Sequence, residues 1–455
     1  MGLEAQPRER RIGLALLPLA LVFLSVGIST AVVGPFRSLF LSTAVHAGPA
    51  KVTFFLIGVP LSGVVASTLL GRLSDRRPIR RRLLIGAAVA GLIGTAVTAF
   101  VRDYWILLGL TVTATALAGA MFPQTFAYAH QVLQRDSPGR AALGISTLRT
   151  VFSLAWVAGP PLAAFLLDVG GFRYVYGMAA VMYALAALVA VFWLDEVDAP
   201  APKAADDTAD AAPTANRLKL LLTVVAFTLL MCPLTLSVQA LPLFVSVDLG
   251  RDVADAGLLL GLCAALEIPL MLGLGALTTR VPLRPLVLGG AACGVAYYAV
   301  AAATPNVWLL FGAQLLNALF IAAVSGLGIS YVQEMLPGQP GRASTLFSNT
   351  FPIGAVLAGP LFGLSQHFGY RLAYLMATAL CLAGLLLLVL MLINDTTRAR
   401  LNRVHGNSQK TQGDSPYVRS GRRERLMAWP FGLLKATDQY RIVISRTFHP
   451  KGGTR

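Results

Sequence analysis

Long apolar segments alternate with short polar or Pro/Gly-containing breaks along most of the chain. The apolar runs are 18 to 25 residues long, which is the length that a helix needs to cross about 30 Å of hydrocarbon. We therefore predict an all-α membrane protein. Its twelve transmembrane helices would lie at residues 12–40, 52–72, 83–101, 105–128, 148–168, 173–194, 218–246, 256–278, 285–303, 306–332, 345–366 and 370–394.

The predicted spans form two groups of six on either side of a polar stretch, 195–217. Ala, Pro and Asp recur in this stretch, which cannot bury a core and is typical of a flexible linker. The pattern divides the chain into five parts. These are a cytoplasmic N-terminus 1–11, a six-helix half 12–194, the linker 195–217, a second half 218–394 and a basic tail 395–455.

Two stretches, 138–176 and 340–374, repeat the same motifs in the same order. Each contains P-G-R-A, then A-G-P, then Gly-aromatic-Arg-x-x-Tyr. The copies begin at Pro138, Ala158 and Gly171 in the first half, and at Pro340, Ala358 and Gly369 in the second. A duplicated half-bundle of membrane helices is typical of transporters that alternate access around a site between their halves. We therefore expect two six-helix pseudo-repeats.

Composition and charge support this interpretation. Of the 455 residues, 56% are hydrophobic and 13% charged, with a mean hydropathy of +0.69, whereas soluble domains carry about a quarter charged residues. With the N-terminus inside, 31 of the 37 Lys and Arg residues fall on the cytoplasmic side. Basic residues prefer that side, so we predict that both termini are cytoplasmic.

The basic tail accounts for much of the net charge of +16. Residues 398–455 hold 13 basic and three acidic residues. A solvated or lipid-facing arm is the favoured interpretation, and nucleic-acid binding is the alternative. We expect a monomer in the lipid bilayer with no nucleic-acid partner.

The loop between spans two and three contains a Gly-Arg-Leu-Ser-Asp-Arg motif with three positions of interest, Gly71, Asp75 and Arg76. Glycine at a helix end permits close helix contact, and Asp75 can bind a helix N-terminus or an Arg across the half-bundle. We predict a conformational latch, with a simple positive-inside anchor as the alternative. The loop resembles the G-x-L-[AS]-D-R-x-G-R-R signature of the major facilitator superfamily, although Pro78 replaces its Gly. The second half has Thr279 in place of the Asp.

Further stretches resemble the sugar efflux transporter family of that superfamily. They are residues 121–124, 153–161, 262–269, 314–321, 333–338 and 345–349, in that order. The resemblance implies export of small sugars or glycosides, driven by a proton gradient, across a bacterial inner membrane. A multidrug or hydrophobic-solute exporter of the same fold is the first alternative, and a membrane scaffold whose tail recruits a partner is the second.

Glu267 is the acidic side chain that lies well inside a predicted span. An ionised carboxylate in hydrocarbon costs several kcal/mol, so Glu267 should face the bundle interior, find a partner or carry a proton. A carboxylate that gains and loses a proton beside a cavity suits a proton antiporter. We predict that Glu267 couples transport to protons. A protonated structural Glu bonded to a neighbouring helix is the alternative.

Buried amides supply the candidate substrate contacts, because an amide offers both donors and acceptors to a hydroxyl-rich ligand. Gln314 and Asn317 share one helix face, and hydrogen bonding between helices is the alternative role for each amide. Trp156 could stack on a sugar ring, although core packing is more usual for such a residue. The candidates are Gln124, Gln239, Gln314, Asn317, Asn349 and Trp156.

Matched Gly-Pro pairs occur once in each half, Gly159-Pro160 and Gly359-Pro360. Proline removes a backbone donor and kinks a helix, so we predict that these pairs are pivots of a rocking motion. Plain packing kinks are the alternative. The chain contains no phosphate-binding G-x-x-x-x-G-K-[ST] loop, no H-E-x-x-H and no paired Cys/His metal spacing. We therefore predict no enzymatic activity, no cofactor and no metal.

Overall fold

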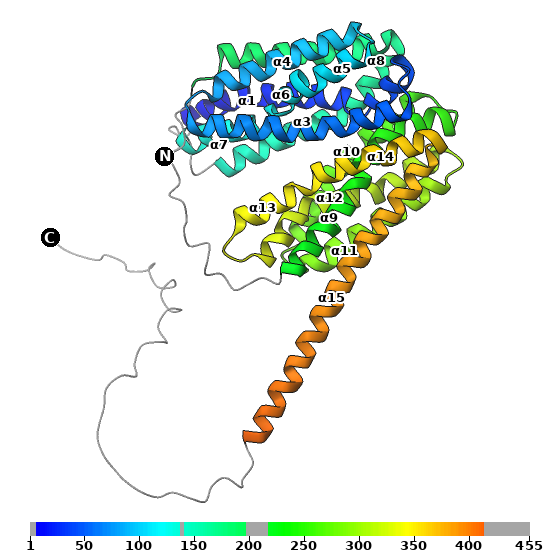
Figure 1. Cartoon of the computed structure of the whole chain (residues 1–455). Helices are drawn as coiled ribbons and strands as arrows, with labels where there is room; N and C mark the ends of the chain where they lie inside the picture. Colours follow the sequence, from blue (N-terminus) through cyan, green and yellow to red (C-terminus); the bar gives the residue numbers. More distant parts are fainter. Residues whose placement is uncertain (1–5, 137–140, 197–216, 414–455) are drawn as a thin grey trace, which may run out of the picture. The chain divides into compact units, whose positions relative to one another are not determined.

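The computed structural model describes residues 6–136, 141–196 and 217–413, and its regular elements there are all helical (Figure 1). Most of the predicted linker, the P-G-R of the first P-G-R-A motif and the tail beyond residue 413 lie outside the described residues. The first half contains α1 (Gln6–Val33), α2 (Arg37–Leu39), η1 (Phe40–Ala44), α3 (Pro49–Arg76), α4 (Arg80–Phe100), α5 (Tyr104–Leu110), η2 (Thr111–Thr115), α6 (Ala116–Gly119), α7 (Met121–Asp136) and α8 (Ala141–Phe192). The second half contains α9 (Arg217–Leu243), η5 (Phe244–Asp248), α10 (Val253–Leu277), α11 (Leu283–Ala303), α12 (Val307–Met335), α13 (Pro340–Ser348), α14 (Thr350–Phe368) and α15 (Arg371–Gly413).

Within the described residues, ten helices are long and apolar enough to cross a membrane. An eleventh follows if Leu17–Val33 and Arg37–Ala44, which meet at a bend of 44°, are one span. The segment Leu143–Phe192 counts once among the ten although it is 50 residues long. Its backbone leaves the helical region at Gly170 and Gly171, where φ reaches 65° at Gly171, a conformation that glycine adopts without steric cost. The fold is therefore that of an all-helical, multi-pass membrane protein.

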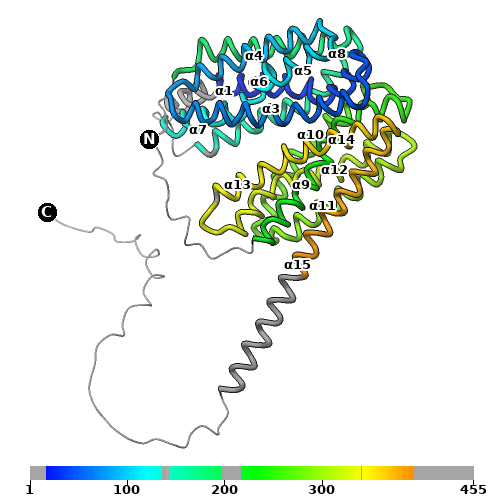
Figure 2. The backbone as a smooth tube through the Cα atoms, viewed as in Figure 1, coloured from blue at the N-terminus to red at the C-terminus, as the bar shows by residue number. Residues whose placement is uncertain are grey.

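Chain contacts divide the protein into two units, residues 1–395 and residues 396–455. The first unit contains both six-helix groups. Within the first group α1 and α4 pack on α8, and within the second α10 and α11 pack on α12 (Figure 2). Between the groups, α8 packs on α10, α3 on α14 and, to a smaller extent, α2 on α9.

The contact between the halves is concentrated at one end of the helices, which we call the closed end. One hydrophobic core combines residues of the second half with Val32–Val52 and Ala163–Ala179 of the first half. A second core belongs to the first half alone and lies around Leu19, Ala87, Tyr128 and Ala190. The first-half residues that take part in the shared core therefore lie at the closed end.

The two halves also share a local structural feature at the closed end. In each half the first long helix ends in a π-helical turn, η1 and η5, that starts with a phenylalanine. The Arg102 guanidinium lies 5.2 Å from the ring of Phe40, and that of Arg371 lies 5.8 Å from the ring of Phe244. A cation–π contact therefore covers each turn, although the two arginines differ in position, since the repeat counterpart of Arg371 is Arg173.

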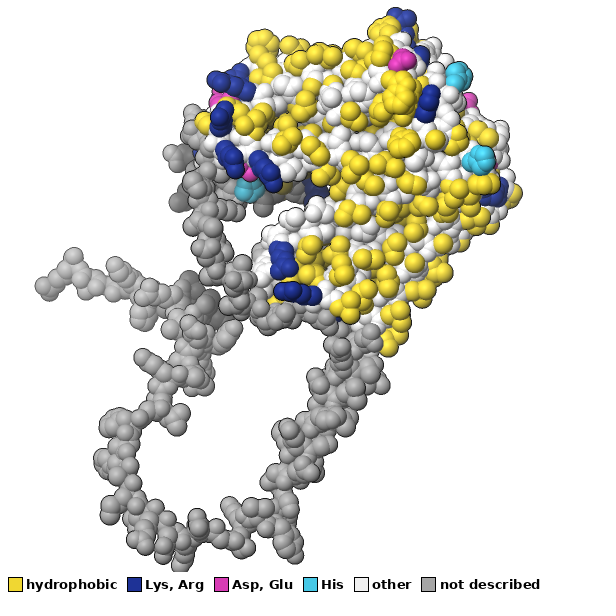
Figure 3. Space-filling model, in the orientation of Figure 1, with side chains coloured by type: hydrophobic (Ala, Val, Ile, Leu, Met, Phe, Trp, Pro, Cys, Tyr) yellow, Lys and Arg dark blue, Asp and Glu magenta, His cyan; other side chains and the backbone are white. Residues whose placement is uncertain are grey.

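The outer surface of the first unit is apolar over a broad zone. Figure 3 shows hydrophobic side chains spread over the visible face, with basic side chains gathered toward its margins. Large apolar residues such as Phe54, Trp105 and Trp308 are about 70% exposed. Exposed apolar area on this scale suits hydrocarbon rather than water.

Candidate functional site

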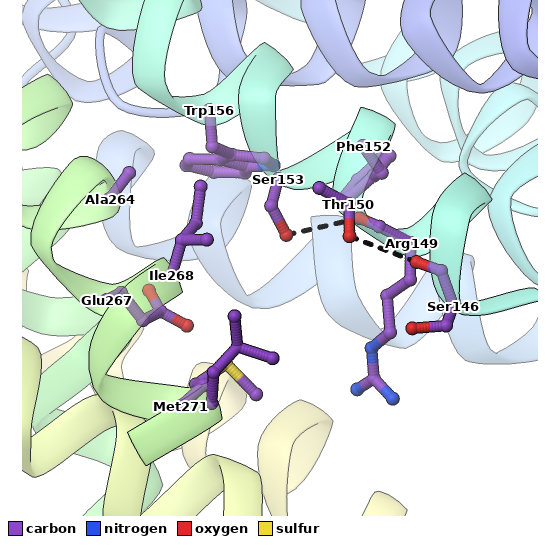
Figure 4. Close-up of a pocket in the computed structure, with 11 residues that line it drawn as sticks. Ser146, Arg149, Thr150, Phe152, Ser153, Trp156, Ala264, Glu267, Ile268 and Met271 are labelled. Atoms are coloured by element: carbon purple, nitrogen blue, oxygen red, sulfur yellow. Dashed lines mark hydrogen bonds between the residues drawn. The ribbon is translucent and has the colours of Figure 1, made fainter. Parts of the chain in front are cut away.

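A pocket of about 390 Å³ lies between the two halves, with walls from α8 and α10 (Figure 4). We call the end of the helices that holds it the pocket end. Its lining residues are Ser146, Arg149, Thr150, Phe152, Ser153, Trp156, Ala264, Glu267, Ile268, Met271 and Leu272. The volume falls in the range of small-molecule sites.

The α8 wall is mostly polar. Ser146, Arg149, Thr150 and Ser153 follow the i, i+3, i+4, i+7 spacing that aligns side chains on one face of a helix. The Thr150 hydroxyl donates to the Ser146 carbonyl oxygen (3.1 Å) and the Ser153 hydroxyl to that of Arg149 (3.2 Å). Their lone pairs therefore remain available to accept hydrogen bonds from a ligand.

The α10 wall is apolar except for Glu267. Ala264, Ile268, Met271 and Leu272 surround this carboxylate, which is partly buried. Within the described residues Glu267 makes no hydrogen bond or ion pair, and its electrostatic partner is Arg149 on the opposite wall. The alternative of a structural Glu hydrogen-bonded to a neighbouring helix therefore finds no partner in the described part of the chain.

Trp156 is partly exposed in the same pocket, beside Ser153 and across from Ala264 and Ile268 (Figure 4). One edge of its indole approaches the bend between α1 and α2, because a Cβ on Gly34 would lie 3.9 Å from Cη2 of Trp156. The ring is thus held on one side and accessible on the other, as a stacking surface requires.

Arg149 is the pocket residue that the sequence analysis missed. The residue falls one position inside the predicted span 148–168, and the count of basic residues assigned it to the cytoplasmic loops. Its place inside an apolar span was the available signal. Nothing in one sequence, however, relates a residue of α8 to Glu267, more than a hundred positions later.

Gln314 and Asn317 are buried within the second half and bond to each other. The Asn317 amide donates to Gln314 Oε1 (3.1 Å) and to the Cys263 sulfur (3.3 Å), and Gln314 Nε2 donates to the Tyr297 hydroxyl (3.4 Å). Asn317 Oδ1 is buried without a partner among the described residues. These bonds tie α10, α11 and α12 together one helical turn from Glu267.

The other three amides lie apart from the pocket lining. Gln239 is buried at the closed end, where its side chain donates to the carbonyl oxygen of Gly34 in the other half (3.0 Å). Gln124 is buried in α7 with its Oε1 unpaired within the described residues. Asn349 is exposed at the junction of α13 and α14. Of the six candidate substrate contacts, the pocket lining thus includes Trp156.

Comparison with known proteins adds to this geometry. The chain matches the family model of the Major Facilitator Superfamily over residues 19–304 and 223–437. It is 35% identical over 365 residues to sugar efflux transporter B of Salmonella typhimurium, covering 78% of this chain and 92% of that protein. It is also 35% identical over 368 residues to sugar efflux transporter A of Dickeya chrysanthemi, covering 80% and 92%. The chain belongs to the sugar efflux transporter family.

The fold comparison agrees with this assignment. The crystal structure of a point mutant of the nucleoside transporter NupG superposes with a TM-score of 0.70 at 14% identity, over 83% of this chain and 99% of that one. The resemblance to the sugar efflux transporter family is confirmed, and with it the prediction that the chain is a membrane transporter and not an enzyme.

The loop motif of the superfamily forms a local contact in this member of the family. Arg80 Nη2 binds the Asp75 carboxylate at 2.9 Å and the Ser74 hydroxyl at 3.2 Å. Asp75 is exposed and Arg80 buried, while Arg76 is exposed. A Cβ on Gly71 would lie 3.9 Å from the Gln124 amide. The observed bond ties α3 to α4 within one half, and the latch stays a prediction.

The two Gly-Pro pairs lie at helix contacts of the family fold. A side chain on Gly159 would collide with Ala31 of α1, and a Cβ on Gly359 would lie 2.9 Å from Ile57 of α3 in the other half. A Cβ on Gly257 of α10 would lie 2.7 Å from the carbonyl oxygen of Pro160. Both prolines therefore lie in helices that contact the other half.

Proposed function

We propose that this chain exports small sugars or glycosides by proton antiport, using alternating access around the pocket between α8 and α10. The observation that carries the proposal is the position of Glu267, an acidic side chain on the wall of an inter-half pocket whose other wall is lined with hydroxyl groups. A carboxylate in such a place can exchange its proton with the pocket water. The names of the relatives support sugars as the cargo.

The topology proposed for this function has twelve spans. Dividing the 50-residue segment at Gly170–Gly171 and counting the bent pair as one span accounts for twelve. The distribution of Lys and Arg supports cytoplasmic termini, and the bacterial relatives support an inner-membrane location. In this orientation the pocket end faces the cytoplasm, so the described conformation would receive substrate from inside.

The amphipathic lining suggests how a glycoside would bind. Arg149, Ser153 and Thr150 would contact sugar hydroxyl groups from the α8 wall, and Trp156 would stack on the ring. Ionised Glu267 would accept a hydrogen bond from a sugar hydroxyl. The apolar α10 wall, with Ile268, Met271 and Leu272, supports the second candidate function, export of hydrophobic solutes. Uptake of a labelled glycoside and of a lipophilic dye by the same inside-out vesicles separates the two functions. Dye transport without sugar transport would contradict the proposal.

The decisive experiment uses vesicles with an imposed pH gradient, acidic in the compartment that corresponds to the cell exterior. We expect the wild-type chain to accumulate the glycoside against its gradient. Glu267→Gln should lose this uphill accumulation while retaining exchange of labelled for unlabelled substrate, because the amide cannot exchange a proton. Glu334→Gln, an exposed carboxylate at the end of α12, is the matched control. Normal proton-driven accumulation in Glu267→Gln would disprove the role of Glu267.

The tail offers a test of the scaffold alternative. Deleting residues 398–455 should leave glycoside flux unchanged if the chain acts as a transporter. Loss of flux in the deletion, with Glu267→Gln unaffected, would favour the scaffold.

A further inference from the structure

Two opposite charges face the pocket from different halves of the protein. Arg149 is carried by α8 of the first half and Glu267 by α10 of the second (Figure 4). The charge of Arg149 acts on Glu267, yet within the described residues no hydrogen bond or ion pair joins them. They form a pair held apart by the open pocket.

The two helices, α8 and α10, touch beside the pocket, on the side of it that is nearer the closed end. Pro161 lacks an N–H, so the Val157 carbonyl oxygen has no helical partner there, and Gly261 of α10 packs against it. A Cβ on Gly261 would lie 2.7 Å from the Val157 oxygen, and one on Gly257 would lie 2.7 Å from the Pro160 oxygen. Backbone lies against backbone, so the crossing can serve as a fulcrum.

Both charges lie to the same side of this crossing, because α8 and α10 run in opposite directions there. Arg149 precedes Val157 by eight residues and Glu267 follows Gly261 by six, so each is about 9 to 12 Å from the crossing along its helix. A rigid-body rotation of about 15° at the crossing would change their separation by about 2 to 3 Å. That change is enough to convert a solvent-separated pair into a contact pair.

We infer that Arg149 and Glu267 form the gate of the pocket end. Ionised Glu267 draws Arg149 across the pocket and favours closure of this end, and protonated Glu267 releases Arg149 and favours the open state. The inference rests on the proposed proton coupling and adds to it a residue, Arg149, that positions the halves according to the charge of Glu267.

This gate gives the direction that an antiporter needs. With the pocket end closed and the other end open, a proton from outside neutralises Glu267, the attraction to Arg149 is lost, and the pocket end reopens. The proton then leaves Glu267 to pocket water on the cytoplasmic side. Because ionisation favours closure, closure in turn favours ionisation by the same free energy.

Arg149 supplies the charge that acts on Glu267. Arg149 of α8 and Cys263 of its own helix are the titratable groups that act on it. Three other elements pack on α10, and they carry charged residues near their ends: Arg217 and Lys219 on α9, Asp248 on η5 and Glu334 on α12.

The test measures conformation rather than transport. Ala47 is buried at the closed end, where its carbonyl oxygen accepts a bond from Gln366 of the other half. Ala47→Cys should therefore react with a membrane-impermeant maleimide only when that end opens. Maleimide reacts with the thiolate, so each rate is divided by the rate of a free thiol compound at the same pH. We expect this corrected labelling rate to rise about 3- to 10-fold from acidic to alkaline pH, the range of a partly screened ion pair. The chain without Ala47→Cys provides the background of the native cysteines.

Variants show whether the pH response depends on the pair formed by Arg149 and Glu267. Arg149→Gln and Glu267→Gln should each leave slow labelling whose corrected rate does not change with pH, and Arg149→Lys should retain the pH response. The exchanged pair, Arg149→Glu with Glu267→Arg, should restore fast labelling. Arg280→Gln, an exposed cation just beyond α10, is the matched control and should behave as wild type.

Three results would overturn the inference: a flat response in the wild type, an unchanged response in Arg149→Gln, or an equal loss in Arg280→Gln. The assay needs no substrate, so it is independent of the flux experiment. A pH-dependent gate without proton-driven flux would refute the proposed function alone. Proton-driven flux with a flat labelling response would refute the gate alone.

Discussion

The two ends of the contact between the halves are built from different chemistry. At the closed end the halves are joined by neutral groups: Gln239 donates to Gly34, Ser38 donates to the Gln239 carbonyl oxygen, and Gln366 donates to Ser42 (3.2 Å). At the pocket end the two halves present Arg149 and Glu267, which are not in contact.

The difference teaches how such a protein can move. A neutral hydrogen bond contributes about 1 kcal/mol net, because water replaces it when it breaks. A few such bonds hold an end closed without fixing it there. A pair of charges depends on protonation, and so it can tie conformation to the proton gradient. The neutral bonds of the closed end set the balance between the two conformations. We propose that the charged pair of the pocket end makes that balance depend on protonation.

The largest expected effect comes from the crossing that separates the two ends. In Gly261→Leu the new side chain meets the Val157 carbonyl oxygen and the Pro161 ring, and overpacking of this kind typically costs about 1 to 3 kcal/mol. We expect more than a tenfold loss of glycoside flux, because α8 and α10 can no longer touch. Flux in reconstituted vesicles measures the effect, alongside the thermal unfolding midpoint in detergent.

A glycine on the same helix supplies the control. No atom lies within 4 Å of the position that a Cβ on Gly273 would occupy, so Gly273→Leu should transport as the wild type does. Equal losses in both variants would show that α10 tolerates no leucine for reasons unrelated to the crossing.

The helices and the family were both predictable, but from different features of the sequence. The apolar runs predicted an all-helical membrane protein, and the ordered motif blocks indicated the sugar efflux transporter family. Helix boundaries differed where the backbone departs from ideal geometry. The span predicted as 105–128 contains the π-helical turn η2, and the one at 345–366 changes element at Asn349. Such local winding depends on packing, which the hydrophobic pattern does not encode.

The site was predictable only in part. Glu267 and Trp156 are unusual enough in an apolar span to be identified singly, and both line the pocket. The amides could not be assigned a role in this way. An amide that bonds across helices and one that binds a ligand look the same in sequence. Gln239 illustrates this, since its partner Gly34 is about 200 positions away. Arg149 was missed because its role depends on the partner across the pocket.

The next effect probes the pocket end alone. Trp156→Leu should raise the KM for glycoside about fivefold to tenfold, since stacking on an aromatic ring is worth about 0.5 to 1.5 kcal/mol. Trp156→Phe should recover much of the loss. Concentration-dependent exchange in vesicles gives the KM, and Trp308→Leu, an exposed residue at the start of α12, is the control. An unchanged KM in Trp156→Leu would assign Trp156 to packing.

The smallest effect probes the closed end alone. Gln239→Leu removes the bond to Gly34, and one neutral hydrogen bond corresponds to about a threefold to fivefold shift between two states. We expect faster maleimide labelling of Ala47→Cys by that factor at every pH, with the pH response itself unchanged. Ser246→Ala is the control, because the Ser246 hydroxyl bonds carbonyl oxygens of its own helix segment. If Gln239→Leu abolished the pH response instead, the two ends would not be separable, and the division of labour between neutral and charged contacts would be wrong.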